Sequence, residues 1–312
     1  MDSSLNLSRL AKYFSDEHAA RELLESMRWP DGPDCPVCGQ TATVYRMLKL
    51  ATSKTPGRAG LLRCRQCKKQ FTVTTGTVFE DSHIPLSKWL LALHLLAASK
   101  KGMSAHQFHR MLGITYKSAW FMAHRLRYAM STEPLAGLMA GVVEVDETYI
   151  GARNKRGTKR GRPGPDSHKT PVVALVERGS GRVRAFPMPR VTAQNLDAAI
   201  NAHIEPDAMM MTDEFSAYQA LGRKNHQTVN HAREEYVRGD VYTNTAEGFF
   251  SLLKRGITGV YHHVGRGHLN RYCDEFAFRY ENRKVDDSTR AEMIVNGAEG
   301  KRLTYKQPSG TR

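Results

Sequence analysis

The sequence predicts an α/β protein in which a layered domain of strands and helices follows a small metal-bound β module and a helical segment. Three observations lead to this prediction. Strand-like and helical runs alternate between residues 136 and 285, which is typical of layered α/β domains. Two CxxC pairs stand near the N-terminus, and residues 86–129 carry apolar residues at helical spacing.

Composition narrows the classes of partner. The chain has 312 residues, enough for about two domains. It carries 46 Lys and Arg against 31 Asp and Glu, a formal net charge of +15, and a basic surface concentrates polyanions. Nucleic acid is therefore the first candidate partner, and a basic protein without such a partner is the alternative.

No membrane or secretory segment is evident. The longest apolar run, Trp89–Ala98, is shorter than the roughly 18 residues needed to span a bilayer. The N-terminus begins MDSSLNLSRLAKYF and lacks the basic region and apolar core of a secretory signal. We therefore expect no membrane partner and a cytoplasmic location.

Helices are predicted on both sides of the cysteines. Apolar spacing predicts a helix over residues 7–27, and Trp29-Pro30 ends it because a residue before proline leaves the helical region. Residues 31–75 predict short strands and turns. Three further helices are expected after Pro85: an apolar helix through Ala98, a helix from Ser104 to Leu112, and a helix from Thr115 or Lys117 to Met130.

The N-terminal cysteines form two CxxC pairs separated by 25 residues: Cys35, Cys38, Cys64 and Cys67. Each pair places two thiolates on one tight turn, and two such turns complete the tetrahedron of a structural zinc site. A redox dithiol or buried free thiols are the alternatives, and neither explains two pairs. Because so small a β module has little core, we expect the zinc ion to supply much of its folding energy. Cys273, in a later helical run, is interpreted as a packing residue.

Residues 104–127 resemble a helix-turn-helix. A short helix, Gly113 and a second helix follow one another, and in that motif the second helix enters the major groove of DNA. Basic and aromatic residues recur there at spacings of three or four and share a face, so we predict DNA contacts from Lys117, His124 and Arg127, with Trp120 between them. A plain helical hairpin with a solvated basic face is the alternative.

Residues 136–285 predict a sheet with helices between and after its strands. The strand-like runs are 141–150, 171–176, 182–187 and 208–212, with a helix near 193–203 and two further helices after them. A basic loop, 151–169, separates the first two runs. We predict that it binds DNA phosphates through Arg153, Lys155, Arg156, Lys159 and Arg160. A solvated loop without a partner is the alternative.

Three acidic residues stand inside or beside apolar runs. Asp146 lies within the first strand-like run, Asp213 follows the run 209–212, and Glu247 stands in a helical run. A carboxylate in such a place is costly to bury unpaired, so it usually has a cation or a metal as partner. Because side chains alternate along a strand, Glu144 shares the face of Asp146, whereas Glu147 points to the other face.

Glu247 has two interpretations. In a helix, Asn244, Glu247, Ser251 and Lys254 share one face, which would present Glu247 to a site. Alternatively, Asn244 is the N-cap and Glu247 completes a capping box without any chemistry. Both interpretations hold together if the helix starts at the site.

Several blocks resemble bacterial insertion-sequence transposases with a DDE catalytic domain. They are VEVDETYIG at 143–151, TDEFSAY at 212–218, TNTAEGFFSLLKRG at 243–256 and HLNRYCDEFAFRY at 268–280, and a zinc ribbon precedes them. The resemblance covers residues 15 to 285. It implies a ribonuclease-H-like fold, a mixed sheet flanked by helices. It also implies a set of site residues: Asp146, Asp213 and Glu247 as metal ligands, Asn244 sharing or taking the third position, and Lys254 with Arg255 as DNA contacts.

These expectations divide the chain into five parts: an N-terminal helix at 1–30, the zinc ribbon at 31–80, a helical DNA-binding segment at 81–134, the DDE catalytic domain at 135–285, and a polar tail at 286–312 that we expect to fray.

The reaction that we expect is phosphoryl transfer on DNA, with two Mg²⁺ ions and Mn²⁺ as the alternative ion. Water nicks the transposon end and frees a 3′-hydroxyl, which then attacks target DNA, so no nucleotide cofactor is needed. The expected partners are transposon ends, target DNA and further copies of the chain, at least a dimer on DNA, associated with the nucleoid when bound. The alternatives are a zinc-ribbon DNA-binding regulator without catalytic activity and a ribonuclease-H-like nuclease.

Overall fold

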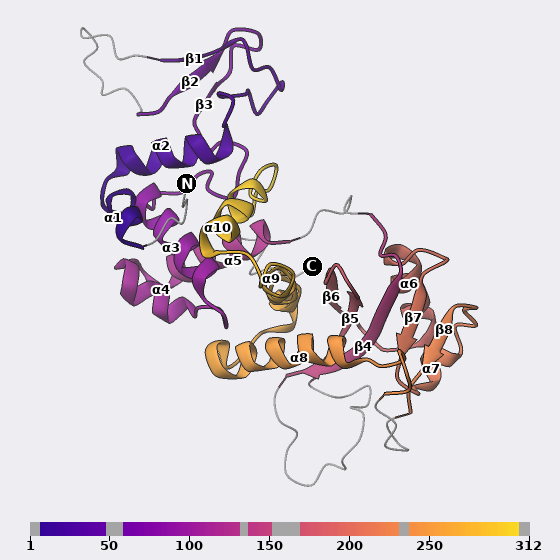
Figure 1. Cartoon of the computed structure of the whole chain (residues 1–312). Helices are drawn as coiled ribbons and strands as arrows, with labels where there is room; N and C mark the ends of the chain where they lie inside the picture. The colour runs from indigo at the N-terminus through magenta and orange to yellow at the C-terminus, as the bar shows by residue number, and fades with distance from the viewer. Residues whose placement is uncertain (1–6, 48–58, 132–136, 152–168, 231–236, 306–312) are drawn as a thin grey trace, which may run out of the picture. The chain divides into compact units, whose positions relative to one another are not determined.

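The computed structural model describes residues 7–47, 59–131, 137–151, 169–230 and 237–305 (Figure 1). The chain forms two compact units. The first unit contains Met1–Met130 together with Val285–Gly310, and the second contains Ser131–Lys284. Within the described ranges, no helix has the length and apolar character needed to cross a membrane.

The first unit begins with two helices, α1 (Leu7–Ser15) and α2 (Glu17–Arg28). The sequence predicts one helix here, and Asp16 explains the break. Its backbone is extended, and its side chain accepts a hydrogen bond from the N–H of His18 at 2.8 Å. Aspartate is a favoured N-cap, so it starts a second helix. That helix ends before Trp29, as predicted.

The cysteine region forms a three-stranded antiparallel sheet in the order β1-β2-β3, with β1 at Val44–Arg46, β2 at Leu62–Cys64 and β3 at Gln70–Phe71. The three predicted helices follow as α3 (Leu86–Ala98), α4 (Ala105–Leu112) and α5 (Tyr116–Ala129). Ser104 caps α4 through the N–H of Gln107 at 3.2 Å, and Gly113 ends it in the left-handed conformation.

The C-terminal segment differs from the expected frayed tail. Helix α10 spans Asp287–Asn296, and Asp286 caps it by accepting hydrogen bonds from the N–H groups of Ser288 and Thr289 at 2.9 Å. The helix packs against α3, α2 and α5. Only a few apolar side chains make this contact, Ala291, Ile294 and Val295, so the polar composition of the segment conceals it.

The second unit contains a five-stranded sheet in the order β6-β5-β4-β7-β8. Strand β5 is antiparallel to β4 and β6, whereas β7 is parallel to both β4 and β8. This order and these directions are those of a ribonuclease-H-like sheet, which confirms the predicted fold class. The strands are β4 (Val142–Ile150), β5 (Thr170–Glu177), β6 (Val183–Pro187), β7 (Met209–Thr212) and β8 (His226–Thr228).

Helices cover both faces of this sheet. The side chains of β5 alternate: Ala174 packs on the side of Phe249 and Phe276, whereas Val173 packs on the side of Leu196 and Tyr218. Helices α8 and α9 therefore cover one face, and α6 and α7 cover the other (Figure 1). Their bounds are α6 (Ala193–His203), α7 (Ser216–Gln219), α8 (Asn244–Gly256) and α9 (Leu269–Glu281), with a π turn at Ile257–Tyr261 and a 3-10 turn at Arg266–His268.

Gly256 provides a test of the packing between α8 and α9. A Cβ atom at this position would overlap the ring of Phe276, which is fully buried. Gly256→Ala is therefore expected to destabilise the second unit by about 1–3 kcal/mol through overpacking. Gly248→Ala in the same helix is the control. Its Cβ would have no neighbour within 4 Å, so it should be neutral or stabilising by about 0.5–1 kcal/mol.

The measurement has to separate the two units. The three tryptophans, Trp29, Trp89 and Trp120, all lie in the first unit, so tryptophan fluorescence follows that unit alone. Hydrogen exchange of peptides from β5 and β6 during urea unfolding follows the second unit. Equal stability of the two alanine variants would contradict the close packing of Gly256 on Phe276.

Candidate functional site

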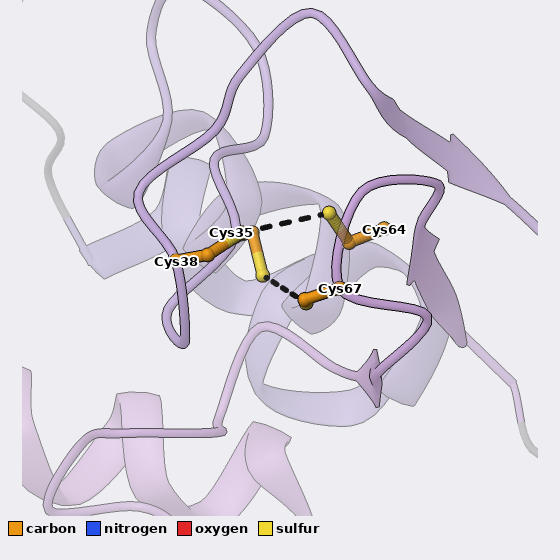
Figure 2. Close-up of side chains that lie close together, drawn as sticks. All are labelled: Cys35, Cys38, Cys64 and Cys67. Carbon is orange, nitrogen blue, oxygen red and sulfur yellow. Dashed lines mark hydrogen bonds between the residues drawn. The ribbon is translucent and has the colours of Figure 1, made fainter.

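The four cysteines predicted as zinc ligands lie together beside the small sheet (Figure 2). The Sγ atoms of Cys35 and Cys67 are 3.6 Å apart, and those of Cys38 and Cys64 are 3.7 Å apart. All four sulfur atoms lie within 4.8 Å of one another. A tetrahedron with Zn–S bonds of about 2.3 Å has edges of about 3.8 Å. The residues therefore fit a structural zinc ion.

The two turns that carry these cysteines have the same backbone form. Gly39 and Lys68 each follow the second cysteine of a pair, with φ of 71° and 62°. The turns are closed by hydrogen bonds from the N–H of Cys35 to the carbonyl of Gln40 at 2.9 Å and from the N–H of Cys64 to that of Lys69 at 3.1 Å. Glycine adopts positive φ without strain, whereas lysine rarely does. The sequence therefore shows the first turn more clearly than the second.

Cys64 is prepared for metal binding by its surroundings. The hydroxyl of Thr43 lies 3.4 Å from its Sγ atom. That contact, followed by the backbone N–H of Cys67, lowers the pKa of the Cys64 thiol to about 6. Because the thiolate is the form that binds metals, this ligand is available near neutral pH.

Cys64→Ser is expected to release the zinc ion and to unfold the small sheet, because the site needs four thiolates and the sheet has little core of its own. The measurements are zinc content per chain and tryptophan fluorescence of the first unit. Cys273→Ala, in the second unit, is the control and should keep one zinc per chain. Wild-type protein purified without chelator that holds no zinc would contradict the assignment.

Two neighbouring parallel strands bring Asp146 and Asp213 to the same level of the second unit. The register pairs Glu144 of β4 with Met211 of β7, and the two aspartates stand two residues further along each strand. Adjacent strands are about 4.8 Å apart. Asp213 is the first residue after β7, and its carboxylate accepts the N–H of Phe215 at 3.1 Å, which turns the chain towards α7.

Helix α8 carries the third candidate position. It begins at Asn244, and Glu247 lies in its first turn. Both side chains are exposed, together with Ser251 and Lys254, so the predicted polar face is confirmed. The N-cap is Thr243, whose side chain makes no capping hydrogen bond. The capping box with Asn244 as N-cap therefore does not form.

Glu144 holds the start of α8 beside Asp146. It is 0% exposed, and its Oε2 atom accepts the N–H of Thr245 at 2.8 Å and that of Ala246 at 3.0 Å. Since Glu144 and Asp146 share a face of β4, this contact brings Glu247 to the aspartates. Sequence analysis treated Glu144 only as a neighbour of Asp146. The signal for its role was a carboxylate set between two valines, which requires donors from elsewhere in the fold.

The electrostatics of Asp146 show that the acidic residues face one another. Burial, the adjacent charge of Glu147, and then Asp213 and Glu247 raise the pKa of Asp146 to about 8. A bound cation would have the opposite effect, because it favours the ionised form. Carboxylate oxygens suit Mg²⁺ or Mn²⁺ rather than zinc, so these residues fit such an ion. Within the described ranges, only the cysteines bring three or more such ligand atoms within 4.8 Å of one another.

Contacts from the neighbouring elements brace both aspartates. On the opposite face of β4, Glu147 accepts a hydrogen bond from the buried hydroxyl of Tyr218 at 2.7 Å. Beside Asp213, the hydroxyl of Thr212 donates to the Asp213 carbonyl at 2.8 Å and lies 2.8 Å from Nε2 of His226. Sequence analysis missed both contacts, because Tyr218 and His226 reach β4 and β7 only through the tertiary fold.

The residues predicted to bind DNA are placed unevenly. Lys117 is exposed, but His124 is 0% and Arg127 is 2% exposed. The predicted exposed face of α5 is therefore wrong for these two residues, because α5 packs against α4, α3 and α10. Lys254 and Arg255 are exposed in the last turn of α8. The five loop residues Arg153, Lys155, Arg156, Lys159 and Arg160 lie outside the described residues.

The raised pKa of Asp146 predicts how stability depends on pH in protein that holds zinc but no added Mg²⁺. The ordinary pKa is 3.8, and in the folded chain it is about 8, so between these values the folded state binds the extra proton. Stability of the second unit should therefore fall as pH rises from about 4 to about 8. Asp146→Asn should remove this dependence and be more stable than wild type at pH 8 by at least about 1 kcal/mol.

Urea unfolding at several pH values, followed by hydrogen exchange in β5, measures this difference. Asp197→Asn, an exposed position on α6, is the control and should behave as wild type. Saturating Mg²⁺ should reduce the advantage of Asp146→Asn. A wild-type stability that rises between pH 5 and pH 8 relative to Asp146→Asn would contradict the proximity of the carboxylates.

Comparison with known proteins agrees with both regions. Residues 15–70 match a transposase zinc-ribbon domain, and residues 138–281 match an ISXO2-like transposase domain. A relative described as an uncharacterized protein in transposable element ISH50 of Halobacterium salinarum is 29% identical over 288 residues, covering 86% of this chain and 92% of the relative.

Among solved structures, a chain from the cryo-EM structure of a simian T-cell lymphotropic virus intasome in complex with PP2A regulatory subunit B56 gamma is 13% identical, with a TM-score of 0.24. The match covers 65% of this chain and spans 64% of that one, and a likeness this weak carries no argument. The two matched domains, on a zinc-binding module and a ribonuclease-H-like unit, show that the chain belongs to the insertion-sequence transposases with an ISXO2-like transposase domain.

Proposed function

We propose that this transposase cleaves the ends of a transposable element and joins them to target DNA. The observation that carries the proposal is the meeting of Asp146 and Asp213 on adjacent parallel strands with Glu247 on α8, where their charges act on one another. Carboxylates gathered at a strand end, in a partly buried place, are suited to bind divalent cations and to orient a phosphodiester between them.

The reaction has two steps with the same chemistry. Water attacks the phosphorus at the element end, the bond from phosphorus to the 3′-oxygen breaks, and the element keeps a 3′-hydroxyl. That hydroxyl then attacks a target phosphodiester, and the target 3′-oxygen leaves with a proton. When bound, two Mg²⁺ ions supply Lewis-acid activation and neutralise the charge of the transferring group. The carboxylates hold the reacting oxygens in line, and no nucleotide cofactor takes part.

Contacts with DNA are assigned to exposed basic residues. Lys254 and Arg255 stand in the last turn of α8, the helix that carries Glu247. Lys117 stands at the start of α5, and the basic loop 151–169 adds phosphate contacts without sequence preference. With the net charge of +15, these residues support binding to the element ends and the target, as at least a dimer on DNA, in the cytoplasm and at the nucleoid.

Removal of one acidic side chain is expected to abolish catalysis while the fold remains. Asp146→Ala and Asp213→Ala should lower Mg²⁺-dependent end cleavage and strand transfer by at least about 100-fold, because the metal ligands support most of the transition-state stabilisation. DNA binding should persist. The assay uses DNA that carries the inverted repeats flanking the gene, with cleavage and joining measured separately.

Controls make the result specific. Asp197→Ala removes an exposed carboxylate from α6 and should retain full activity. Activity of Glu247→Gln with loss in Asn244→Ala would move the third position to Asn244, and the reverse would keep Glu247. Near-normal cleavage by a folded Asp146→Ala or Asp213→Ala variant would overturn the proposed function.

A further inference from the structure

A buried ion pair connects β4, the segment before α8, and α8 itself. Glu144 is 0% exposed, and Arg178 donates from Nε to its Oε1 atom at 2.6 Å. The same oxygen accepts the hydroxyl of Thr245 at 2.7 Å, and Oε2 accepts the N–H groups of Thr245 and Ala246. The carboxylate therefore accepts four hydrogen bonds, three of them from the first turn of α8.

These bonds supply what α8 does not supply for itself. The first N–H groups of a helix need acceptors from outside it, and Thr243 makes no side-chain capping hydrogen bond. A glutamate on β4 takes that place, and its negative charge also suits the positive end of the helix dipole. The start of α8 is therefore fixed to a strand rather than to its own N-cap residue.

Arg178 fixes the approach to the helix in the same way. It donates from Nη1 to the carbonyl of Asp240 and from Nη2 to the carbonyl of Tyr242, both at 2.7 Å. Its guanidinium lies 3.5 Å from the centre of the Tyr242 ring, and its own N–H donates to Val142 of β4 at 2.9 Å. One side chain thus connects the end of β5 to the two residues that lead into α8.

We propose that Glu144 and Arg178 are positioning residues for the metal site: they fix the first turn of α8 relative to β4, and so set the reach from Asn244 and Glu247 to Asp146. Glu144 stands two residues from Asp146 on the same face of β4, and Glu247 follows directly after Ala246. The proposal rests on the proposed function, since it gives these residues a role in cation affinity. It also excludes Glu144 as a metal ligand, because both of its oxygens are used by the helix and by Arg178.

Thr245 offers the gentlest test. Replacement of Glu144 would leave the Arg178 charge buried without its partner, which can unfold the unit. Thr245→Val keeps the shape of the side chain and removes one of the four hydrogen bonds, and Thr245→Ser restores the hydroxyl. Arg178→Lys keeps the positive charge but loses the forked donors. Leu253→Val is the matched control, because it loosens α8 in its buried face, far from the first turn.

Two measurements besides activity follow the variants. Hydrogen exchange of peptides covering residues 243–248 reports whether the first turn is held. Titration with Mn²⁺, followed by electron paramagnetic resonance, reports cation affinity. For Thr245→Val and Arg178→Lys we expect faster exchange in that peptide and about 3- to 10-fold weaker Mn²⁺ binding, at the lower end of what loss of a metal ligand's outer partner causes. Thr245→Ser should restore both values.

The half-saturating Mg²⁺ concentration in DNA cleavage should rise by the same factor, with little change in the rate at saturating Mg²⁺. Leu253→Val should lower thermal stability without altering Mn²⁺ affinity. If wild type binds Mn²⁺ and cleaves DNA while folded Thr245→Val and Arg178→Lys match it in affinity and exchange, the positioning role is overturned. If wild type neither binds Mn²⁺ nor cleaves, the proposed function fails instead, and faster exchange in Thr245→Val would then show a helix contact without a catalytic purpose.

Discussion

A carboxylate buried in an apolar strand needs hydrogen-bond donors that only the tertiary fold can bring to it. Glu144 obtains them from α8 and from Arg178. The first unit contains a parallel case: Glu17 of α2 accepts the N–H groups of Leu86 and Ser87 at 2.8 and 3.0 Å, at the start of α3, where the N-cap Pro85 makes no side-chain capping hydrogen bond. In both units a glutamate from another element caps the helix, so the start of the helix and its docking form together.

The two candidate metal centres place opposite demands on the chain. The cysteine sulfurs stand at the edge lengths of a tetrahedron around zinc, and the ion supplies stability that the small sheet lacks. The carboxylates around Asp146 instead repel one another, as its raised pKa records. Such a site costs stability until a cation arrives. The second unit can bear that cost because a sheet covered by helices on both faces supplies a large core.

Local patterns predicted most of this fold. Helices α3, α4, α5 and α6 appear where spacing and caps place them, because those signals lie within the elements themselves. The cysteine cluster and the polar face of α8 followed from spacing for the same reason. The capping role of Glu144, the burial of Arg127 and the docking of α10 depend on partners far away in sequence. No local pattern encodes those partners, so the periodicity of α5 suggested an open basic face that α10 and its neighbours in fact cover.

The return of α10 to the first unit has a consequence for biosynthesis. Helices α3 and α5 are made early, but the helix that packs on them leaves the ribosome only after the whole second unit. At ~5–20 residues per second, that delay is roughly 10–30 s. The catalytic unit is then complete while apolar surface on the zinc-bearing unit still awaits its cover. Translation therefore finishes last the unit that it started first, and chaperones have that interval in which to bind the exposed helices.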